Sequence, residues 1–314
     1  MNNDVLNSLN IGAVLRDSEH TCVSLSFSKD GSALGAGFED GTVNVIDTES
    51  AAVIRTHRSH KYGLSHFTFL SQERSGTHAV AAASPNVVED HSIRVWDLVS
   101  NRFTRIFRFH ETAIGSISVH PNKDIFISSS KDGNTCIWDL REEKPVWQCR
   151  DTKSVVSAFD KKDGSHVFAV TFPSVSGVSL FDLRNFQAPL REIKKFTSPA
   201  DELSFSADGS KLLIGSWVLG MVATINTDSA LVEATYFLPP TKTPYHVSTS
   251  ACSRYAIATN PHKTADIWDL KSRLKIRSLT GHDSAPIAVF SPKHLMVATA
   301  TMPVALWVPF PKPQ

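Results

Sequence analysis

The stretch from His110 to Asp139, HETAIGSISVHPNKDIFISSSKDGNTCIWD, decides the fold of this 314-residue chain. Apolar and small polar residues alternate over Ile114–Val119, and the apolar run Ile125–Ile127 is followed by three serines. The tight turn Lys131–Gly133 then leads into Thr135–Asp139. Side chains alternate between the two faces of a strand, so a period of two bounded by turn residues predicts consecutive β-strands and not helices.

The end of this stretch recurs along the chain. An apolar residue followed by Asp, or by a substitute for Asp, closes each of seven units, at Ile46-Asp47, Trp96-Asp97, Trp138-Asp139, Phe181-Asp182, Ile225-Asn226, Trp268-Asp269 and a degenerate Trp307-Val308. The second residues of consecutive pairs lie 50, 42, 43, 44, 43 and 39 residues apart. A period of about 40–45 residues is typical of WD repeats, each of which folds into a four-stranded blade. The sequence therefore predicts an all-β chain that forms a single seven-bladed WD-repeat β-propeller.

The repeat divides this single domain, 1–314, into successive blades. The last unit supplies only three strands, so we expect segment 10–16 to pair with it as a closing outer strand, which removes free sheet edges. The predicted blades are 17–50, 51–100, 101–145, 146–190, 191–235, 236–278 and 279–309, followed by a tail at 310–314.

A histidine that opens a unit, an aspartate in its turn and the closing tryptophan form a candidate structural network. A hydrogen bond between His and Asp, extended through Ser or Thr to the indole N–H, would satisfy buried polar groups and fix the register of the blade. The two predicted networks are His60/Asp90/Trp96 and His110/Asp132/Trp138. His, Asp and Ser could also suggest a hydrolase triad, but a single active site would not recur once per repeat.

The overall charge and the cysteines restrict the class of protein. The 32 Lys and Arg residues against 31 Asp and Glu give a net charge of +1, which argues against direct attraction to nucleic acid or an anionic membrane. None of the four cysteines forms a C-x-x-C pair, so reduced thiols are expected. Neither a signal peptide nor a membrane span is recognisable, and the sequence predicts a soluble, intracellular protein.

No pattern of catalytic, cofactor-binding or metal-ligating residues stands out. The segment Gly35–Gly41 has a third glycine one place too late for a dinucleotide loop and reads as a blade turn. His57 and His60 lack a set of Cys or carboxylate partners at zinc-ligand spacing. We expect no enzyme activity, no cofactor and no metal.

The loops around one mouth of the central channel give a candidate binding ring. The positions before each turn Asp and after each opening His place Lys61, Tyr62, Lys131 and Lys263 there, with Glu39 and Glu89 interrupting the ring. Lysines beside a tyrosine suit an acidic or phosphorylated peptide. The alternative is that these lysines only keep the propeller soluble.

Four stretches resemble the WD-repeat protein 82 family. They are the opening segment Leu6–Arg16, the unusual Lys61-Tyr62-Gly63, the sequence Phe181–Phe186 that closes the fourth unit, and the ending Ala298–Pro309. The chain departs from the family pattern in loops, at 72–77, 84–88, Trp217–Gly220 and Asn260–Thr264.

The resemblance implies the propeller subunit shared by COMPASS-type histone methyltransferase complexes and the PNUTS–protein phosphatase complex. Such a subunit would be a monomeric scaffold of the nucleus, or of both the nucleus and the cytoplasm, that acts in histone lysine methylation and transcription termination. The resemblance also implies contact with the phosphorylated C-terminal repeats of RNA polymerase II. The second hypothesis is a free-standing recognition module for acidic or phosphorylated peptides that is unrelated to chromatin.

Overall fold

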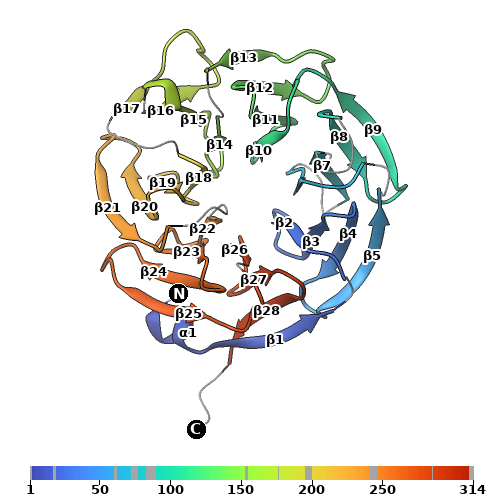
Figure 1. The fold of residues 1–314 in the computed structure, drawn as a ribbon, viewed down its shortest axis with the longest axis vertical. Helices are drawn as coiled ribbons and strands as arrows, with labels where there is room; N and C mark the ends of the chain where they lie inside the picture. Colours follow the sequence, from blue (N-terminus) through green and yellow to red (C-terminus); the bar gives the residue numbers. More distant parts are fainter. Residues whose placement is uncertain are drawn as a thin grey trace.

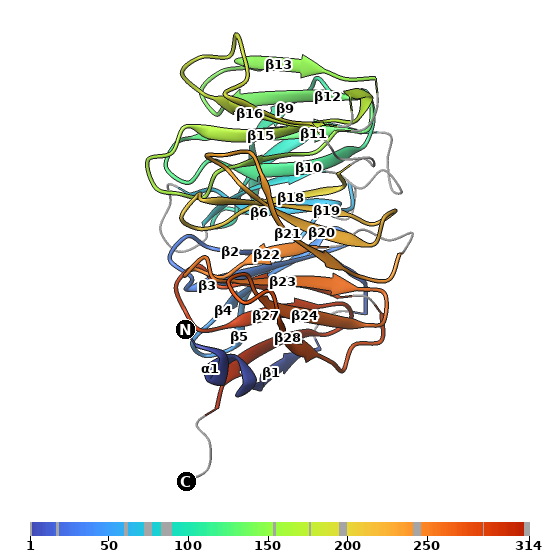
Figure 2. The ribbon, with the colours of Figure 1, turned by 90° about the vertical axis from the view of Figure 1, so that its left-hand side faces the viewer.

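The computed structural model describes residues 2–16, 19–59, 62–71, 77–82, 90–152, 155–175, 177–194, 200–240, 246–284 and 286–310. Its strands form a ring of blades around a central channel, as the prediction of a propeller requires (Figure 1). Seen edge-on, the strands run across the thickness of the disc (Figure 2). No helix among these described residues is long and apolar enough to cross a membrane.

Each blade is an antiparallel sheet of four strands, and the described strands form seven such sheets. From the channel outward, the strands of blades 1 to 3 are β2 (Cys22–Phe27), β3 (Ala33–Phe38), β4 (Thr42–Asp47), β5 (Ala52–Arg58); β6 (His66–Phe69), β7 (His78–Ala82), β8 (Ile93–Asp97), β9 (Arg102–Phe107); and β10 (Ile114–Val119), β11 (Ile125–Ser130), β12 (Asn134–Asp139), β13 (Trp147–Arg150).

Blades 4 to 7 repeat this order. Their strands are β14 (Ser157–Phe159), β15 (Val167–Phe172), β16 (Gly177–Asp182), β17 (Arg191–Lys194); β18 (Glu202–Phe205), β19 (Lys211–Ser216), β20 (Met221–Asn226), β21 (Val232–Phe237); β22 (Val247–Thr249), β23 (Tyr255–Asn260), β24 (Thr264–Asp269), β25 (Lys275–Leu279); and β26 (Ile287–Phe290), β27 (Val297–Ala300), β28 (Val304–Pro309), β1 (Leu9–Leu15). A short helix, α1 (Asn3–Asn7), and a 3₁₀ turn at Pro173–Val175 complete the described elements.

The boundaries between blades differ from those predicted. Strand β5 pairs with β4 through Thr42 and Arg58, so the first blade extends to Arg58 and does not end at 50. The same holds at the next unit, because β9 pairs with β8 of blade 2 although it lies within the predicted range 101–145. The closing dipeptide ends the third strand of a blade, and the outer strand that follows carries no repeating signal.

The first and last strands close the ring, as expected from the sequence. Strand β1 pairs with β28, with Leu9 opposite Pro309 and Leu15 opposite Val304. A bulge at Gly12 interrupts the register, and a Cβ atom at Gly12 would lie 2.7 Å from Cγ2 of Val308. Glycine is therefore the residue that permits this close approach.

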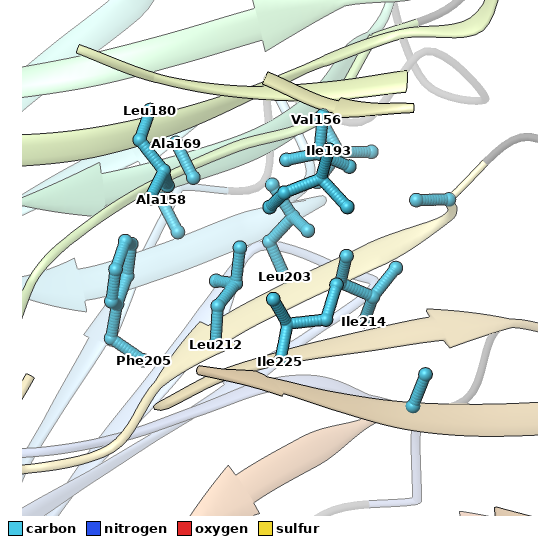
Figure 3. Close-up of a cluster of buried hydrophobic side chains, with 13 residues drawn as sticks. Val156, Ala158, Ala169, Leu180, Ile193, Leu203, Phe205, Leu212, Ile214 and Ile225 are labelled. Atoms are coloured by element: carbon cyan, nitrogen blue, oxygen red, sulfur yellow. The ribbon is translucent and has the colours of Figure 1, made fainter. Parts of the chain in front are cut away.

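Buried hydrophobic side chains lie between neighbouring blades and do not form one central core. Figure 3 shows the cluster between blades 4 and 5, where Leu180 and Ile193 face Phe205, Ile214 and Ile225. Burial of one such side chain contributes about 1.5–3 kcal/mol. Because each sheet has a neighbour on both faces, its middle strands are buried on both faces, as β3 and β4 of blade 1 show.

Hydroxyl groups connect the inner strands around the channel. The Ser24 hydroxyl of β2 accepts from the N–H of Phe67 in β6 at 3.1 Å and donates to its carbonyl at 2.8 Å. The Ser116 hydroxyl of β10 accepts from the N–H of Ser157 in β14 at 3.0 Å. These bonds satisfy backbone groups at sheet edges that would otherwise be unpaired.

Candidate functional site

The antiparallel order of the strands assigns each loop to one of two faces of the disc. Loops that join the second and third strands of a blade lie on the same face as those that join one blade to the next. Tyr62 lies between β5 and β6, Lys131 between β11 and β12, and Lys263 between β23 and β24. All three therefore lie on one face, which we call the upper face. The predicted Lys61 lies outside the described residues.

Lys131 and Lys263 are both exposed at the tips of hairpin turns. Lys131 donates its N–H to the carbonyl of Ala113 at 3.0 Å, which ties the turn to the loop that enters blade 3. Lys263 has φ of 65°, the left-handed conformation that tight hairpin turns require. Both ammonium groups are thus presented to solvent by constrained backbone.

Tyr62 has a structural role that the sequence did not predict. The guanidinium of Arg94 lies 3.8 Å from the centroid of the Tyr62 ring, and Arg94 is only 3% exposed. Its charge is balanced by Asp90, which also accepts the N–H of Ser92 at 2.9 Å. Burial raises the pKa of Asp90, but the hydrogen bonds from Ser92 and Arg94 outweigh this effect and lower it to about 2. Tyr62 therefore covers the buried guanidinium of this ion pair, while the Asp90 carboxylate is partly exposed.

The predicted network of blade 3 is formed in part. Ser128 accepts the indole N–H of Trp138 at 2.8 Å and shares a hydrogen bond with Nε2 of His110 at 2.8 Å. The Asp132 carboxylate instead accepts the backbone N–H groups of Glu111 and Asn134, at 3.0 and 2.8 Å. Nδ1 of His110 is consequently buried without a partner among the described residues. The predicted hydrogen bond between His110 and Asp132, both of which the structure describes, is therefore not formed.

Burial sets the protonation state of this histidine. It lowers the pKa of His110 to about 4, although the nearby Asp132 carboxylate opposes the shift. His110 is therefore neutral at pH 7. Its role in the chain of hydrogen bonds from Trp138 through Ser128 to His110, which we call the relay, is structural.

The predicted network of blade 2 is wrong where the structure describes it. Trp96 donates its indole N–H to Oδ1 of Asn101 at 3.1 Å, and the same oxygen lies 3.2 Å from Nδ1 of His57. Asp90 is bound to Arg94, and His60 lies outside the described residues. The outer hairpin of this blade thus supplies the partner for Trp96, because Asn101 follows directly in the turn between β8 and β9.

Blade 7 contains a relay that the sequence pattern concealed. Thr299 accepts the indole N–H of Trp307 at 2.7 Å and shares a hydrogen bond with Nε2 of His282 at 2.9 Å. Val308 replaces the usual aspartate and made this unit look degenerate. The signal that identifies the relay is the pair of His282 and Trp307, with a hydroxyl residue on the strand between them.

The central channel encloses a cavity of about 600 Å³. Among the titratable side chains of its lining are His66, Lys161, Glu202 and His246, each from a different blade. Burial lowers the pKa of both imidazoles to about 4; for His66 a backbone hydrogen bond with Gly115 opposes this shift and Lys131 contributes to it. Lys131 lies close to the entrance of this channel at the upper face, because its N–H donates to the carbonyl of Ala113, directly before the inner strand β10.

The acidic and basic groups of the channel are also perturbed by their surroundings. Burial raises the pKa of Glu202 to about 8, Lys161 opposes this effect, and Asp201 adds to it. Burial lowers the pKa of Lys161, whose ammonium donates to the Ser204 hydroxyl at 3.0 Å. Within the described residues, no group of three or more His, Cys, Asp or Glu side chains could hold a metal ion.

Lys29 crosses the opposite, lower mouth of the channel. From blade 1 its ammonium donates to the carbonyl of Pro121 at 2.9 Å and to Oδ1 of Asn122 at 2.6 Å, both in blade 3. It also lies 3.4 Å from the carboxylate of Asp163 in blade 4. The two mouths therefore differ, because a lysine bridges the lower one between three blades.

Comparisons with known proteins agree with this architecture. The family model described as "WD domain, G-beta repeat" matches residues 13–47 and 101–139. WD repeat-containing protein 82 of Drosophila melanogaster is 26% identical over 313 residues, which is 97% of this chain and 96% of that protein. COMPASS component SWD2 of Saccharomyces cerevisiae is 24% identical over 91% of this chain and 90% of its own length. Set1 complex component swd2 of Schizosaccharomyces pombe is 30% identical over 61% of this chain and 53% of its own length.

These matches confirm the resemblance to the WD-repeat protein 82 family that the four stretches indicated. They also agree with the ring of seven four-stranded sheets formed by the described strands.

Proposed function

We propose that this WD-repeat β-propeller, which is similar over nearly its whole length to WD repeat-containing protein 82, is a non-catalytic scaffold subunit of a nuclear chromatin complex. In this role it binds short segments of a histone methyltransferase or of a PNUTS-type phosphatase-targeting partner. It links that partner to RNA polymerase II during histone lysine methylation and transcription termination. The observation that carries the proposal is the near full-length similarity to this protein and to a yeast COMPASS component.

The physical character of the propeller supports a scaffold role. Its polar relays serve the interior of the blades, as the neutral, buried His110 shows. Described turns such as Lys131–Gly133 and Trp217–Gly220 are held by backbone hydrogen bonds, so they present their side chains from a constrained backbone. A rigid ring that presents many such loops suits the binding of extended segments from several partners.

Affinity purification of the tagged full-length chain followed by mass spectrometry tests the proposal. We expect recovery of histone methyltransferase subunits, phosphatase-targeting subunits or RNA polymerase II subunits above an untagged control. A partner set without any transcription or chromatin proteins would overturn the scaffold assignment.

The second candidate, a recognition module for phosphorylated or acidic peptides, is favoured by the position of Lys131 and Lys263. Both residues are exposed on the upper face, and the turn that carries Lys131 is bonded to Ala113, directly before the inner strand β10 that lines the channel. Charge-assisted hydrogen bonds from lysine to phosphate would supply the affinity. In this reading the peptide need not come from a chromatin protein.

Charge reversal at these lysines tests the second candidate. We expect Lys131→Glu with Lys263→Glu to weaken binding of a phosphorylated polymerase-tail peptide by at least about tenfold, because two favourable charges become repulsive. Lys144→Glu with Lys271→Glu provides the matched control, since these exposed lysines lie on the opposite face of the same two blades. Fluorescence anisotropy measures the affinity, and equal binding by both double variants would refute the role of the upper-face lysines.

A further inference from the structure

Blade 5 carries an exposed apolar surface that the proposed function does not yet use. Its upper turn, Trp217–Gly220, contains Val218 and Leu219, which are 59% and 39% exposed. Phe237, at the upper end of the outer strand β21, is 80% exposed. We call the surface formed by Trp217, Val218, Leu219 and Phe237 the blade 5 crest.

The backbone holds the parts of the crest together. Phe237 lies directly opposite Met221, the first residue after the turn, in the ladder between β20 and β21. The N–H of Leu238 donates to the carbonyl of Gly220 at 2.7 Å. Gly220 has φ of 60°, and a Cβ atom there would lie 2.3 Å from the carbonyl oxygen of Leu238. The turn is therefore fixed against the end of β21 by a contact that only glycine allows.

Trp217 anchors the crest in the interior. It packs against the buried cluster between blades 5 and 6, which contains Tyr236, Leu238 and Trp268. Val218 and Leu219 follow it at the tip of the turn and remain exposed. Since the turn is anchored at Trp217, the apolar tip is presented to solvent as a fixed feature.

The outer edge of blade 5 also lacks the usual protection of an edge strand. Edge strands are commonly guarded by charged side chains, especially lysine. The outer strands β5, β9, β13, β17 and β25 each contain Arg or Lys, whereas β21 contains neither, as is also true of the closing strand β1. Glu233, the one charged residue of β21, is paired with Lys211 and accepts from Asn226.

An acidic group without a cationic partner lies beside the crest. Oδ2 of Asp201 accepts the N–H of Trp217 at 3.0 Å, and the N–H of Asp201 donates to the carbonyl of Gly215 at 2.8 Å. Burial raises the pKa of Asp201 to about 6, which the hydrogen bond from Trp217 only partly opposes. No ion pair found within the described residues involves Asp201. A positive charge brought next to Asp201 would therefore be attracted in a partly desolvated setting.

We propose that the blade 5 crest binds a short segment of a partner protein in which an aliphatic or aromatic side chain lies next to an arginine or lysine. The apolar side chain covers Val218, Leu219 and Phe237, and the cation pairs with Asp201. The inference rests on the proposed scaffold function and assigns one of its docking surfaces. Charge complementarity disfavours pairing with the crest of a second copy of this chain, because that crest is formed by apolar side chains beside an acidic one and offers no cation to Asp201.

Binding of synthetic peptides to the full-length chain tests this assignment. The probe is a set of short peptides that carry Leu or Phe beside Arg, Gln or Glu, measured by fluorescence anisotropy. We expect the Arg peptides to bind and the Glu peptides to bind at least about tenfold more weakly. Val218→Ser with Leu219→Ser, and separately Phe237→Ser, should each weaken the Arg peptides by about tenfold. Asp201→Asn should remove the preference for Arg over Gln while the dependence on Leu or Phe remains.

Matched controls test whether the effect on peptide binding is specific to the crest or is produced by the loss of any exposed apolar side chain. Val99→Ser and Leu274→Ser replace side chains that are 61% and 64% exposed in other blades, and peptide binding should not change. Absence of peptide binding, equal binding by crest and control variants, or self-association of the chain in sedimentation experiments that is lost in the crest variants would overturn the inference.

The outcome can be distinguished from failure of the scaffold function itself. If the crest assignment is wrong, the wild-type chain and the Phe237→Ser variant recover the same chromatin partners in affinity purification. If the scaffold function is wrong, the wild-type chain recovers no such partners, even when the peptides bind to the crest.

Discussion

In blade 3, Ser128 and Trp138 occupy the positions that Ile214 and Ile225 occupy in blade 5. The registers are equivalent, because Phe126 lies opposite Trp138 and Leu212 lies opposite Ile225. All four side chains are at most 1% exposed. The first pair is joined by a hydrogen bond and continues to His110, whereas the isoleucines join the apolar cluster between blades 4 and 5.

The comparison shows that the relay is one of two solutions to the same packing problem. Replacing both partners of a buried hydrogen bond by apolar groups can be nearly neutral, whereas removing one partner leaves the other desolvated and unpaired. Blade 5 has changed both positions, so its fold does not depend on a polar relay.

Truncation of the tryptophan in blade 3 should have the largest effect. We expect Trp138→Ala to lower the free energy of unfolding by about 4 kcal/mol, because it opens a cavity and leaves Ser128 without its donor. At the equivalent position of blade 5, Ile225→Val should cost about 1 kcal/mol, since it removes one methylene group. Chemical denaturation followed by tryptophan fluorescence and circular dichroism measures both. Similar losses of unfolding free energy for the two variants would mean that Trp138 contributes no more to stability than the residue at the equivalent position of blade 5.

Loss of the central hydroxyl should have an intermediate effect. We expect Ser128→Ala to cost about 2 kcal/mol, because the indole N–H of Trp138 and Nε2 of His110 lose a shared partner. Trp138→Phe removes the indole donor, so the double variant with Ser128→Ala should be more stable by about 1 kcal/mol than the sum of the single effects predicts. Strict additivity in this double-mutant cycle would show that the two side chains are not coupled.

A fall in pH should give the smallest difference in the free energy of unfolding between variants of blade 3 and blade 5. The pKa of His110 is about 4 in the folded chain and near 6.5 when exposed, so the unfolded chain binds the extra proton between these values. The contribution of His110 is therefore present at pH 7 and is lost as the pH falls through this window.

The variant His110→Gln isolates this contribution. Between pH 7 and pH 5, we expect it to lose about 1–2 kcal/mol less stability than the wild-type chain. Ile225→Val in blade 5 should lose stability over this interval as the wild-type chain does, since it changes no titratable group. Denaturation midpoints at the two pH values give the comparison, and an unchanged pH dependence of His110→Gln would contradict the buried, neutral state of His110.

The fold was predictable because the signals that repeat belong to the third strand of each blade. Trp138-Asp139 and its counterparts end that strand, so their spacing gave the number of blades and the ring closure. The outer strands, such as Ala52–Arg58, have no such marker, so the repeat places them in the following unit. Their burial alternates weakly, since one edge and part of one face are exposed.

The polar contacts were predictable only where the partners are local in the repeat. Ser128 lies between His110 and Trp138 in one blade, so the relay could be inferred, whereas the carboxylate of Asp132 accepts backbone N–H groups that no sequence pattern reveals.

The stacking of Arg94 on Tyr62 requires two segments that only the folded ring brings together. The turn Trp217–Gly220 was recognisable as a departure from the family pattern, but its relation to Phe237 and Asp201 needed the structure.

The seam between β1 and β28 has a further consequence. The N–H of Phe310 donates to the carbonyl of Ser8 at 3.1 Å, so the two ends of the ring are already neighbours. A short covalent linker between them, with new termini opened in a surface loop of another blade, would preserve every sheet. The propeller thus has no structural beginning, and which blade is numbered first is an accident of the chain and not a property of the ring.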